Sequence, residues 1–262
     1  MEEDSKKWLW WGIPIVVVAG LATALYYGRK HREAPVTEQV QTPPVAPAAE
    51  PPANHPITPD AGSATQPLPA LGDSDAALQE SLAGVFGRSL ESFLVPKDIV
   101  RHFVVTTDNL TRRKTAAQLW PVKPTGGPLA VAGEDEQLTL SADNFARYQP
   151  IMTVVKNADA KQVASVYRHF YPLFQQAYVE LGYPDGYFNN RLVEVIDHLL
   201  STPEVSGPIK LVQPGVFYQF ADPTLEGRSS GQKLLIRMGN DNAAAVKMKL
   251  RELRREVVKQ AN

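Results

Sequence analysis

The sequence predicts an α+β fold: a predominantly helical soluble domain with a few short antiparallel strands, preceded by one N-terminal transmembrane helix. Two observations lead to this prediction. Apolar residues recur at spacings of three and four through residues 160–182 and again through 187–201, which is the period of an amphipathic α-helix. Residues 8–27 form a run of twenty with no charged side chain, about 30 Å long as a helix and enough to cross the hydrocarbon core of a bilayer.

The apolar run has the flanks of a membrane anchor. Tryptophans lie at its start and tyrosines at its end, where amphipathic rings prefer the headgroup level, and basic residues stand on both sides. We therefore predict an N-terminal tail at 1–7 and a transmembrane helix at 8–28, with the lipid bilayer as the partner of residues 8–28. A cleaved signal peptide is the alternative, because residues 22–24 (ATA) resemble a small-residue cleavage site, but the apolar run continues beyond them.

A proline-rich stretch follows the anchor. Ten of the chain's 22 prolines lie in residues 33–72, which contain no Tyr, Phe, Trp, Lys or Arg. Such a composition does not bury enough apolar area to offset the entropy of ordering the chain. We predict a disordered, semi-stiff spacer at 29–72 and one globular domain at 73–262, whose length is usual for a domain.

The spacer bears on where the domain lies. A long extended linker holds a domain away from its membrane, which favours a single-pass protein of the bacterial inner membrane with its globular domain in the periplasm. The flanking charges point weakly the other way. Two Lys precede the apolar run and three Lys or Arg follow it, and basic residues concentrate on the cytoplasmic side. A cytosolic adaptor tethered to the membrane is therefore the alternative.

Caps, turn residues and periodicity place the elements of the domain. Ser141 or Asp143 suits the start of a helix, Pro96 suits a first helical turn, and residues 121–128 (PVKPTGGP) form a turn cluster. Pro172 should kink the helix at 160–182, because it removes one main-chain hydrogen bond. In chain order we expect helices from 73 or 74 towards 93, from about 96, from 141 or 143, at 160–182, at 187–201 and at about 241–260, with strands within 129–141, 209–222 and 232–238.

Several classes of function lack support in the composition. The formal net charge is −1, so no overall field favours a nucleic-acid partner. The chain has no cysteine, which excludes disulfides, thiolate catalysis and cysteine-based zinc sites. Residues 227–233 (GRSSGQK) have three residues between their glycines where a phosphate loop requires four. We predict no nucleic-acid partner, no cofactor, no metal site and no catalytic residue.

Residues 167–191 hold eight of the chain's eighteen Tyr and Phe. Those on the helix at 160–182 recur at helical spacing, so they form an apolar stripe that favours a core. Tyr183 and Tyr187 differ, because they lie in a turn among glycine and proline residues. Loop aromatics of this kind either bind a partner or close the end of the core, and the second is the more common arrangement.

The helix at 187–201 has an apolar face and a polar face. Glu194 and His198 lie one turn apart on the polar face, a spacing at which two side chains share a proton or a metal. With Asp197, and with Glu180 on the preceding helix, they form the basis of an alternative hypothesis, an envelope enzyme that hydrolyses glycan or peptide. A solvated or salt-bridged face is the simpler interpretation. The candidate binding residues are Tyr183, Asp185, Tyr187, Asn189, Asn190, Arg191, Glu194 and His198.

The last expected helix combines a short apolar stripe with six basic residues between 247 and 259. Such a helix suits an acidic partner or lipid headgroups. The stripe covers barely two heptads, so packing onto the helix's own domain, with the charges solvated, is favoured.

Two long stretches, residues 171–200 (YPLFQQAYVELGYPDGYFNNRLVEVIDHLL) and 211–239 (LVQPGVFYQFADPTLEGRSSGQKLLIRMG), resemble the bacterial family called domain of unknown function 3014. The resemblance covers most of 73–260. It implies a single-span anchor, a proline-rich spacer and one soluble domain, and it implies no known reaction, cofactor or catalytic residue. At Asn190 the resemblance leads us to expect an aspartate instead.

These observations together predict a membrane-anchored binding or scaffold module of the bacterial cell envelope. Its possible partners are another envelope protein or the cell wall. The envelope hydrolase that uses Glu194, Asp197 and His198 is the alternative.

Overall fold

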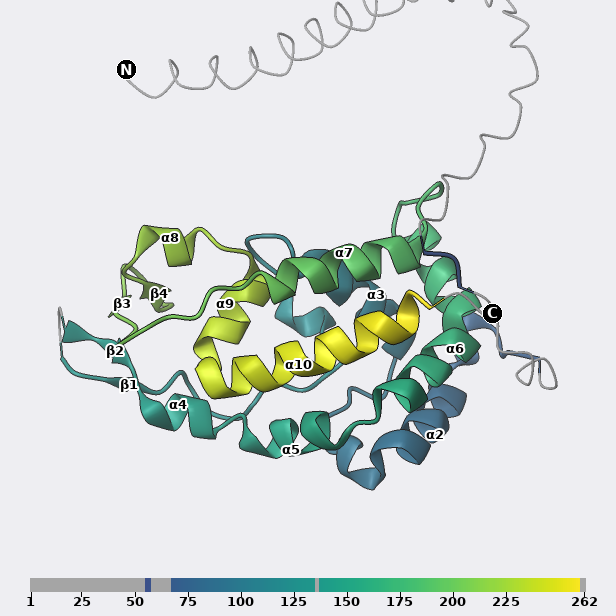
Figure 1. The fold of residues 1–262 in the computed structure, drawn as a ribbon, viewed down its shortest axis with the longest axis horizontal. Helices are drawn as coiled ribbons and strands as arrows, with labels where there is room; N and C mark the ends of the chain where they lie inside the picture. Colours follow the sequence, from purple (N-terminus) through teal and green to yellow (C-terminus); the bar gives the residue numbers. More distant parts are fainter. Residues whose placement is uncertain (1–54, 58–66, 135–136, 260–262) are drawn as a thin grey trace, which may run out of the picture. The chain divides into compact units, whose positions relative to one another are not determined.

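The computed structural model describes residues 55–57, 67–134 and 137–259, and these form a predominantly helical domain (Figure 1). The fold class predicted for the domain is confirmed. The predicted tail, transmembrane helix and most of the spacer lie outside the described residues. Within the described ranges, no helix combines the length and the apolar character that a membrane crossing requires.

Helices make up most of the domain. Short 3-10 turns occur at η2 (Leu71–Asp73), η3 (Arg88–Leu90) and η4 (Ala117–Leu119). The α-helices are α2 (Asp75–Phe86), α3 (Ile99–Asn109), α4 (Ala142–Ala146), α5 (Gln149–Asn157), α6 (Ala160–Glu180), α7 (Phe188–Leu200), α8 (Pro223–Glu226), α9 (Ser230–Arg237) and α10 (Asn240–Val257).

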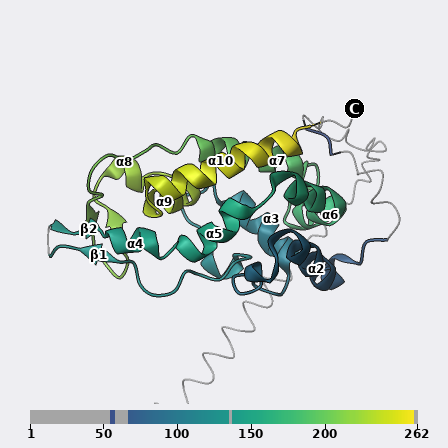
Figure 2. The same cartoon turned by 60° about the horizontal axis from the view of Figure 1, so that its bottom comes forward.

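Two antiparallel hairpins account for the named strands. β1 (Val131–Ala132) pairs with β2 (Thr139–Leu140), as predicted for residues 129–141, and β3 (Leu211–Val212) pairs with β4 (Gln219–Phe220). The hairpins are joined, because Leu140 N–H donates to the Ile209 carbonyl at 2.9 Å. Figures 1 and 2 agree that the hairpins, α4 and α8 lie at one end of the domain and α2 at the other.

The prediction of a strand at 232–238 is wrong, because residues 232–237 belong to α9 and Met238 is its C-cap. Ser229 caps the helix: its hydroxyl oxygen accepts the Gln232 N–H at 3.2 Å. Gly231, Gln232, Leu235 and Ile236 are the buried residues, which is a helical spacing. The short apolar run has no clear period by itself, so only the serine cap distinguishes helix from strand in the sequence.

The helices before α4 also differ from their expected bounds. α2 ends at Phe86, where Gly87 takes a positive φ of 66°, instead of continuing towards Phe93. α3 begins at Ile99 instead of near Pro96, because the Asp75 carboxylate accepts the main-chain N–H groups of Asp98 and Ile99 at 2.8 and 2.9 Å. This cap comes from another helix, which a sequence pattern does not reveal.

The packed domain extends into the segment predicted as spacer. Leu71 is buried in the main core, and Leu68 and Ile57 pack against that core. The globular part of the chain therefore begins before residue 73.

Two helices further along the chain start or continue as the sequence indicates. Ser141 caps α4 as expected, and α6 continues through Pro172 to Glu180.

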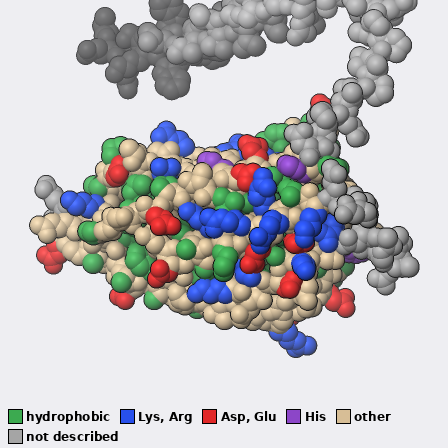
Figure 3. Space-filling view, viewed as in Figure 1, with side chains coloured by type: hydrophobic (Ala, Val, Ile, Leu, Met, Phe, Trp, Pro, Cys, Tyr) green, Lys and Arg blue, Asp and Glu red, His purple; other side chains and the backbone are tan. Residues whose placement is uncertain are grey.

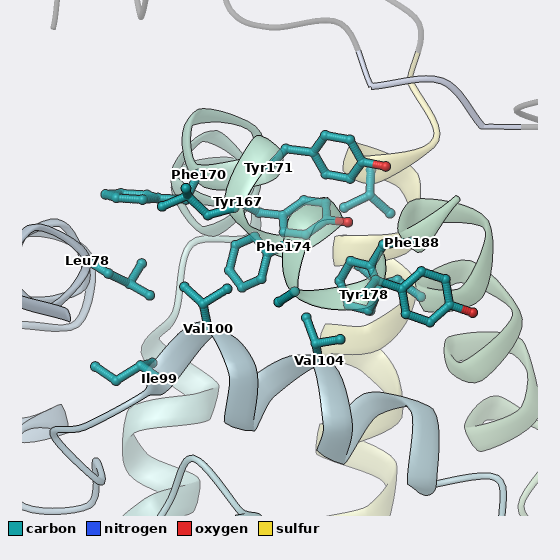
Figure 4. Packing of buried hydrophobic residues seen from close by; sticks show 14 of the residues in the cluster. Leu78, Ile99, Val100, Val104, Tyr167, Phe170, Tyr171, Phe174, Tyr178 and Phe188 are labelled. Atoms are coloured by element: carbon teal, nitrogen blue, oxygen red, sulfur yellow. The ribbon is translucent and has the colours of Figure 1, made fainter. Parts of the chain in front are cut away.

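The apolar stripe of α6 forms the centre of the main core, as predicted. Figure 4 shows its rings facing Val100 and Val104 of α3, with Phe188 at the start of α7 beside Tyr178. The ring of Phe174 lies 5.3 Å from that of Phe103 and 6.1 Å from that of Phe188, measured between centroids. The buried residues of α6 are Ala164, Tyr167, Phe170, Tyr171, Leu173, Phe174, Ala177 and Tyr178.

α10 lies along α6 and α7 and extends the core towards the hairpins (Figure 1). A second cluster of buried residues joins α10 to α5, α7 and α9, and a third joins α9 to the hairpins. The second cluster contains Tyr148, Met152, Val195, Leu199, Leu235, Met238 and Ala243, and the third contains Leu140, Ile209, Leu211, Phe220 and Ile236.

Replacing Gly239 by alanine should destabilise the domain. Gly239 has φ +83° and ψ 159°, a region that is essentially restricted to glycine, and an added Cβ would lie 2.8 Å from the Phe145 ring. We expect Gly239→Ala to lower the free energy of unfolding by about 1–3 kcal/mol, measured by urea unfolding. Gly84→Ala is the matched control, because an added Cβ in α2 meets nothing within 4 Å. Equal effects of the two changes would contradict this account.

Candidate functional site

The turn between α6 and α7 is built by Gln175 of α6. Its side-chain oxygen accepts the Phe188 N–H at 2.8 Å, and its amide nitrogen donates to the Gly186 carbonyl at 2.6 Å. Gly186 is needed in this turn, because an added Cβ would lie 2.6 Å from the Tyr178 ring. One side chain thus closes the turn and supplies a partner for the first main-chain N–H of α7.

The two loop tyrosines pack against the core. The Tyr183 ring stacks on Tyr178, with centroids 4.6 Å apart and an interplanar angle of 18°. The Tyr187 ring lies 5.6 Å from that of Tyr171. Both rings are half-buried, which agrees with the interpretation that they close the end of the core. Their hydroxyl groups reach past the core into two polar clusters.

The first cluster surrounds the carboxylate of Asp108, which ends α3 and is 4% exposed. One oxygen accepts from Arg191 Nε at 3.0 Å, and the other accepts from Arg112 Nη2 at 2.6 Å and from the Tyr183 hydroxyl at 3.2 Å. Arg191 also donates to the Asp108 carbonyl and to Thr111 Oγ1. The buried charge is therefore matched from three directions.

The arginines of this cluster are held in their charged form. The hydrogen bond to Asp108 and the charge of that carboxylate raise the pKa of Arg112. Burial by itself lowers the pKa of Arg191, but the bonds and charges of Glu194 and Asp108 outweigh it, so the pKa is raised. Arg191 pairs with Glu194 at 2.9 Å as well as with Asp108. Its guanidinium is occupied within the domain, which favours a structural role.

The second cluster holds residues 55–57, which come from the predicted spacer. The His55 N–H donates to Asn190 Oδ1 at 3.1 Å, and the His55 carbonyl accepts from Asn189 Nδ2 at 2.8 Å. The Ile57 N–H donates to the Tyr187 hydroxyl at 2.6 Å. Figure 1 shows this short segment near the end of α10, in agreement with its bonds. Three of the predicted binding residues thus contact a peptide segment.

Asn189 is the most deeply buried residue of this second cluster. It is 0% exposed, so the fold buries this candidate binding residue instead of leaving it on the surface. Its oxygen accepts from the Tyr167 hydroxyl at 3.1 Å, and its amide nitrogen donates to the Val257 carbonyl at 3.1 Å as well as to His55. Burial raises the pKa of Tyr167 well above its usual range, so this hydroxyl stays a donor.

The acidic and histidine residues proposed for an envelope enzyme do not form one site, because each is bonded to a different residue. Glu194 pairs with Arg191, and Asp197 forms two bonds with Arg254 of α10 at 2.6 and 2.8 Å. His198 Nε2 lies 2.8 Å from Ser229 Oγ, the cap of α9. Glu180 pairs with Arg101 at 3.0 Å. Among the residues that the structure describes, no group of three or more His, Cys, Asp or Glu is arranged to hold a metal.

The eight predicted binding residues therefore divide into separate groups. Asp185 is exposed in the turn. Tyr183, Arg191 and Glu194 belong to the Asp108 cluster, Tyr187, Asn189 and Asn190 hold residues 55–57, and His198 contacts the cap of α9.

The residues that complete both clusters are not among the candidates predicted from the sequence. Asp108 and Arg112 have the i, i+4 spacing of a helical ion pair, a signal that was available. The partners of Asn189 and Asn190 at His55 were not detectable, because 134 and 135 positions separate them in the chain.

α10 packs onto its own domain, as predicted, but its basic side chains are not all solvated. Lys247 is buried and donates to the Thr202 carbonyl, and Lys249 donates to the Ala158 carbonyl at 2.8 Å. Figure 3 shows Lys and Arg side chains gathered over α10, with acidic side chains among them. Several of these charges are bonded within the domain instead of being only solvated.

The fold and the site define a small helical domain that holds part of its own linker, with acidic side chains paired inside the fold. A family model described as protein of unknown function (DUF3014) matches residues 99–254, and the chain belongs to this family. The match starts at α3 and leaves out α2, although Leu78 of α2 is part of the main core. Neither the curated proteins nor the solved structures contain a match to the chain.

Replacing Asp108 should show that its cluster holds the domain together. Asp108→Asn removes the negative charge that two arginines share, so we expect the free energy of unfolding to fall by about 3 kcal/mol or more. Asp197→Asn is the matched control: it removes an Arg partner at a site where the carboxylate is 47% exposed, and we expect a loss of about 0–1 kcal/mol. Chemical unfolding of both variants provides the measurement. Similar small losses for both would contradict a central role for Asp108.

Proposed function

We propose that this protein is a binding or scaffold module of the bacterial cell envelope. In this proposal, residues 8–28 anchor the chain in the inner membrane, and the globular domain lies in the periplasm. The observation that carries the proposal is that the start of α7 already holds a short stretch of polypeptide, residues 55–57, through its main-chain groups.

The pairing of the titratable groups supports binding over catalysis. General acid–base chemistry needs at least one carboxylate or imidazole that reaches the reacting atom. Glu194, Asp197 and His198 are instead engaged by an arginine of α7, an arginine of α10 and the cap of α9. This geometry gives no specific support to the hydrolase alternative.

The site also lies where a tether enters the domain. Residues 55–57 are held against α7, and 29–54 is the part of the predicted spacer that precedes them in the chain. At about 3.1 Å per residue, this part spans roughly 80 Å when fully extended. The proposed module therefore keeps a long reach from the membrane, while its binding surface sits beside the point of attachment.

A partner in the envelope should contact the α6–α7 turn. We expect a photo-crosslinking amino acid at Asp185, which is exposed in this turn, to give a discrete adduct with an envelope component in intact cells. The same amino acid at Glu80, which is exposed on α2, is the matched control and should give no such adduct. Absence of an adduct at Asp185, or the same adducts at both positions, would argue against this binding surface.

The proposed location has its own test. Alkaline phosphatase, fused after Asn262, should be active if the domain lies in the periplasm, because this enzyme matures only outside the cytosol. A fluorescent reporter that matures only in the cytosol should be dark in the same position. The reverse pattern would place the domain in the cytosol and support the tethered adaptor.

A further inference from the structure

Residues 55–57 are held in the way that a protein holds a peptide ligand. Of the three residues, His55 and Ile57 have a main-chain N–H, and each N–H donates to a side chain of the domain, Asn190 and Tyr187 respectively. Pro56 has no N–H to satisfy, and it is the exposed residue of the three. The main-chain donors of this segment are thus all satisfied by side chains of the α7 region.

The receiving side is built into the core. Asn189 is fully buried, and its amide is already fixed by Tyr167 and Val257. Its remaining N–H points to the His55 carbonyl. A buried amide donor requires a partner, so the position that His55 occupies is one that the fold is shaped to fill. This buried polar group, directed at the segment, distinguishes the site from a chance surface contact.

The contacts define what the site recognises. The residue before a proline is biased to an extended backbone, which presents its N–H and carbonyl to Asn190 and Asn189. The Ile57 side chain is half-buried and packs against the main core, so an aliphatic residue is favoured there. The matching ligand is an extended peptide with any residue, then proline, then an aliphatic residue.

We propose that Tyr187, Asn189 and Asn190 form a recognition site for extended Xaa-Pro-aliphatic peptides, and that residues 55–57 are its resident intramolecular ligand. A partner peptide of the same chemistry competes with this segment. Only nine residues separate Ile57 from Pro67 in the sequence, so the resident segment has an effective concentration on the order of millimolar. This inference rests on the binding function proposed above and names its ligand class and its regulation.

The test measures peptide binding with and without the resident segment. The probe is a fluorescein-labelled peptide with the sequence of residues 51–60 (PPANHPITPD), followed by fluorescence anisotropy with the full chain in detergent micelles. Ile57→Pro removes two features of the resident segment: the N–H that donates to the Tyr187 hydroxyl, and the isoleucine side chain. We expect this variant to bind the probe at least about tenfold more tightly than the unaltered chain, because internal competition is lost.

Two further variants, made in the Ile57→Pro chain, test the chemistry of the site. Asn190→Ala removes the acceptor for one main-chain N–H and should weaken probe binding by about tenfold. Asn190→Asp keeps an acceptor oxygen at that position and should bind the probe as Ile57→Pro alone does. A probe whose isoleucine is replaced by proline should not bind either chain.

Equal probe affinity for the unaltered and Ile57→Pro chains, or no binding by either, would overturn the inference. If Ile57→Pro lowers the thermal unfolding midpoint, His55→Pro replaces it, because that change removes the N–H donated to Asn190 and leaves the Ile57 side chain unaltered. Adducts at Asp185 without probe binding would refute this ligand class and leave the proposed function standing. Probe binding without adducts at Asp185 would support the ligand class and argue against the proposed envelope partner.

Discussion

Burial of the aromatic stripe of α6 is the constraint on which the other parts of this domain depend. The Phe174 ring has three other rings with centroids 5.3–6.1 Å away, one each from α3, α6 and α7. Each large side chain that leaves water contributes roughly 1.5–3 kcal/mol, so burial of the stripe makes a large contribution to the stability of the domain. α3, α7 and α10 take their places by covering it. The turn between α6 and α7 then has little freedom, because Tyr178 and Phe188 are fixed on either side of it.

The pairing of the polar groups at the edge of this aromatic core has the same origin, the packing of helices onto the α6 stripe. Helix ends bring a carboxylate and an amide, Asp108 and Asn189, into regions without water, and burial is costly for such groups unless each is paired. Asp108 is paired by Arg191 and Arg112, and Asn189 by Tyr167, Val257 and His55. Asn189 and Arg191, two of the candidate binding residues, therefore have partners within the fold. Asn189 differs in one contact, because its side-chain amide also donates to the main-chain carbonyl of His55 in the predicted spacer.

Side-chain amides that bind main-chain groups accept many sequences, since most residues present the same N–H and carbonyl groups. They require these groups to be in the correct positions. A proline in the bound segment restricts the backbone before binding and lowers the entropy lost. These properties suit the binding module proposed above, whose partners would share one motif. They also explain how a linker of low complexity docks at one place. Ile57 supplies the apolar contact and one polar contact, to Tyr187, and His55 supplies the two other polar contacts.

The sequence by itself determined the periodic parts of this protein. The stripes at 160–182 and 187–201 and the last helix were predicted because a helix that buries one face repeats apolar residues every three or four positions. α9 was assigned as a strand because its apolar run is too short to show a period. Only the tertiary structure decided that Asp75 caps α3, that Asp108 meets Arg191 and that His55 meets Asn189 and Asn190. These pairs join residues far apart in the chain, and their contacts exist only after the core has brought the helices together.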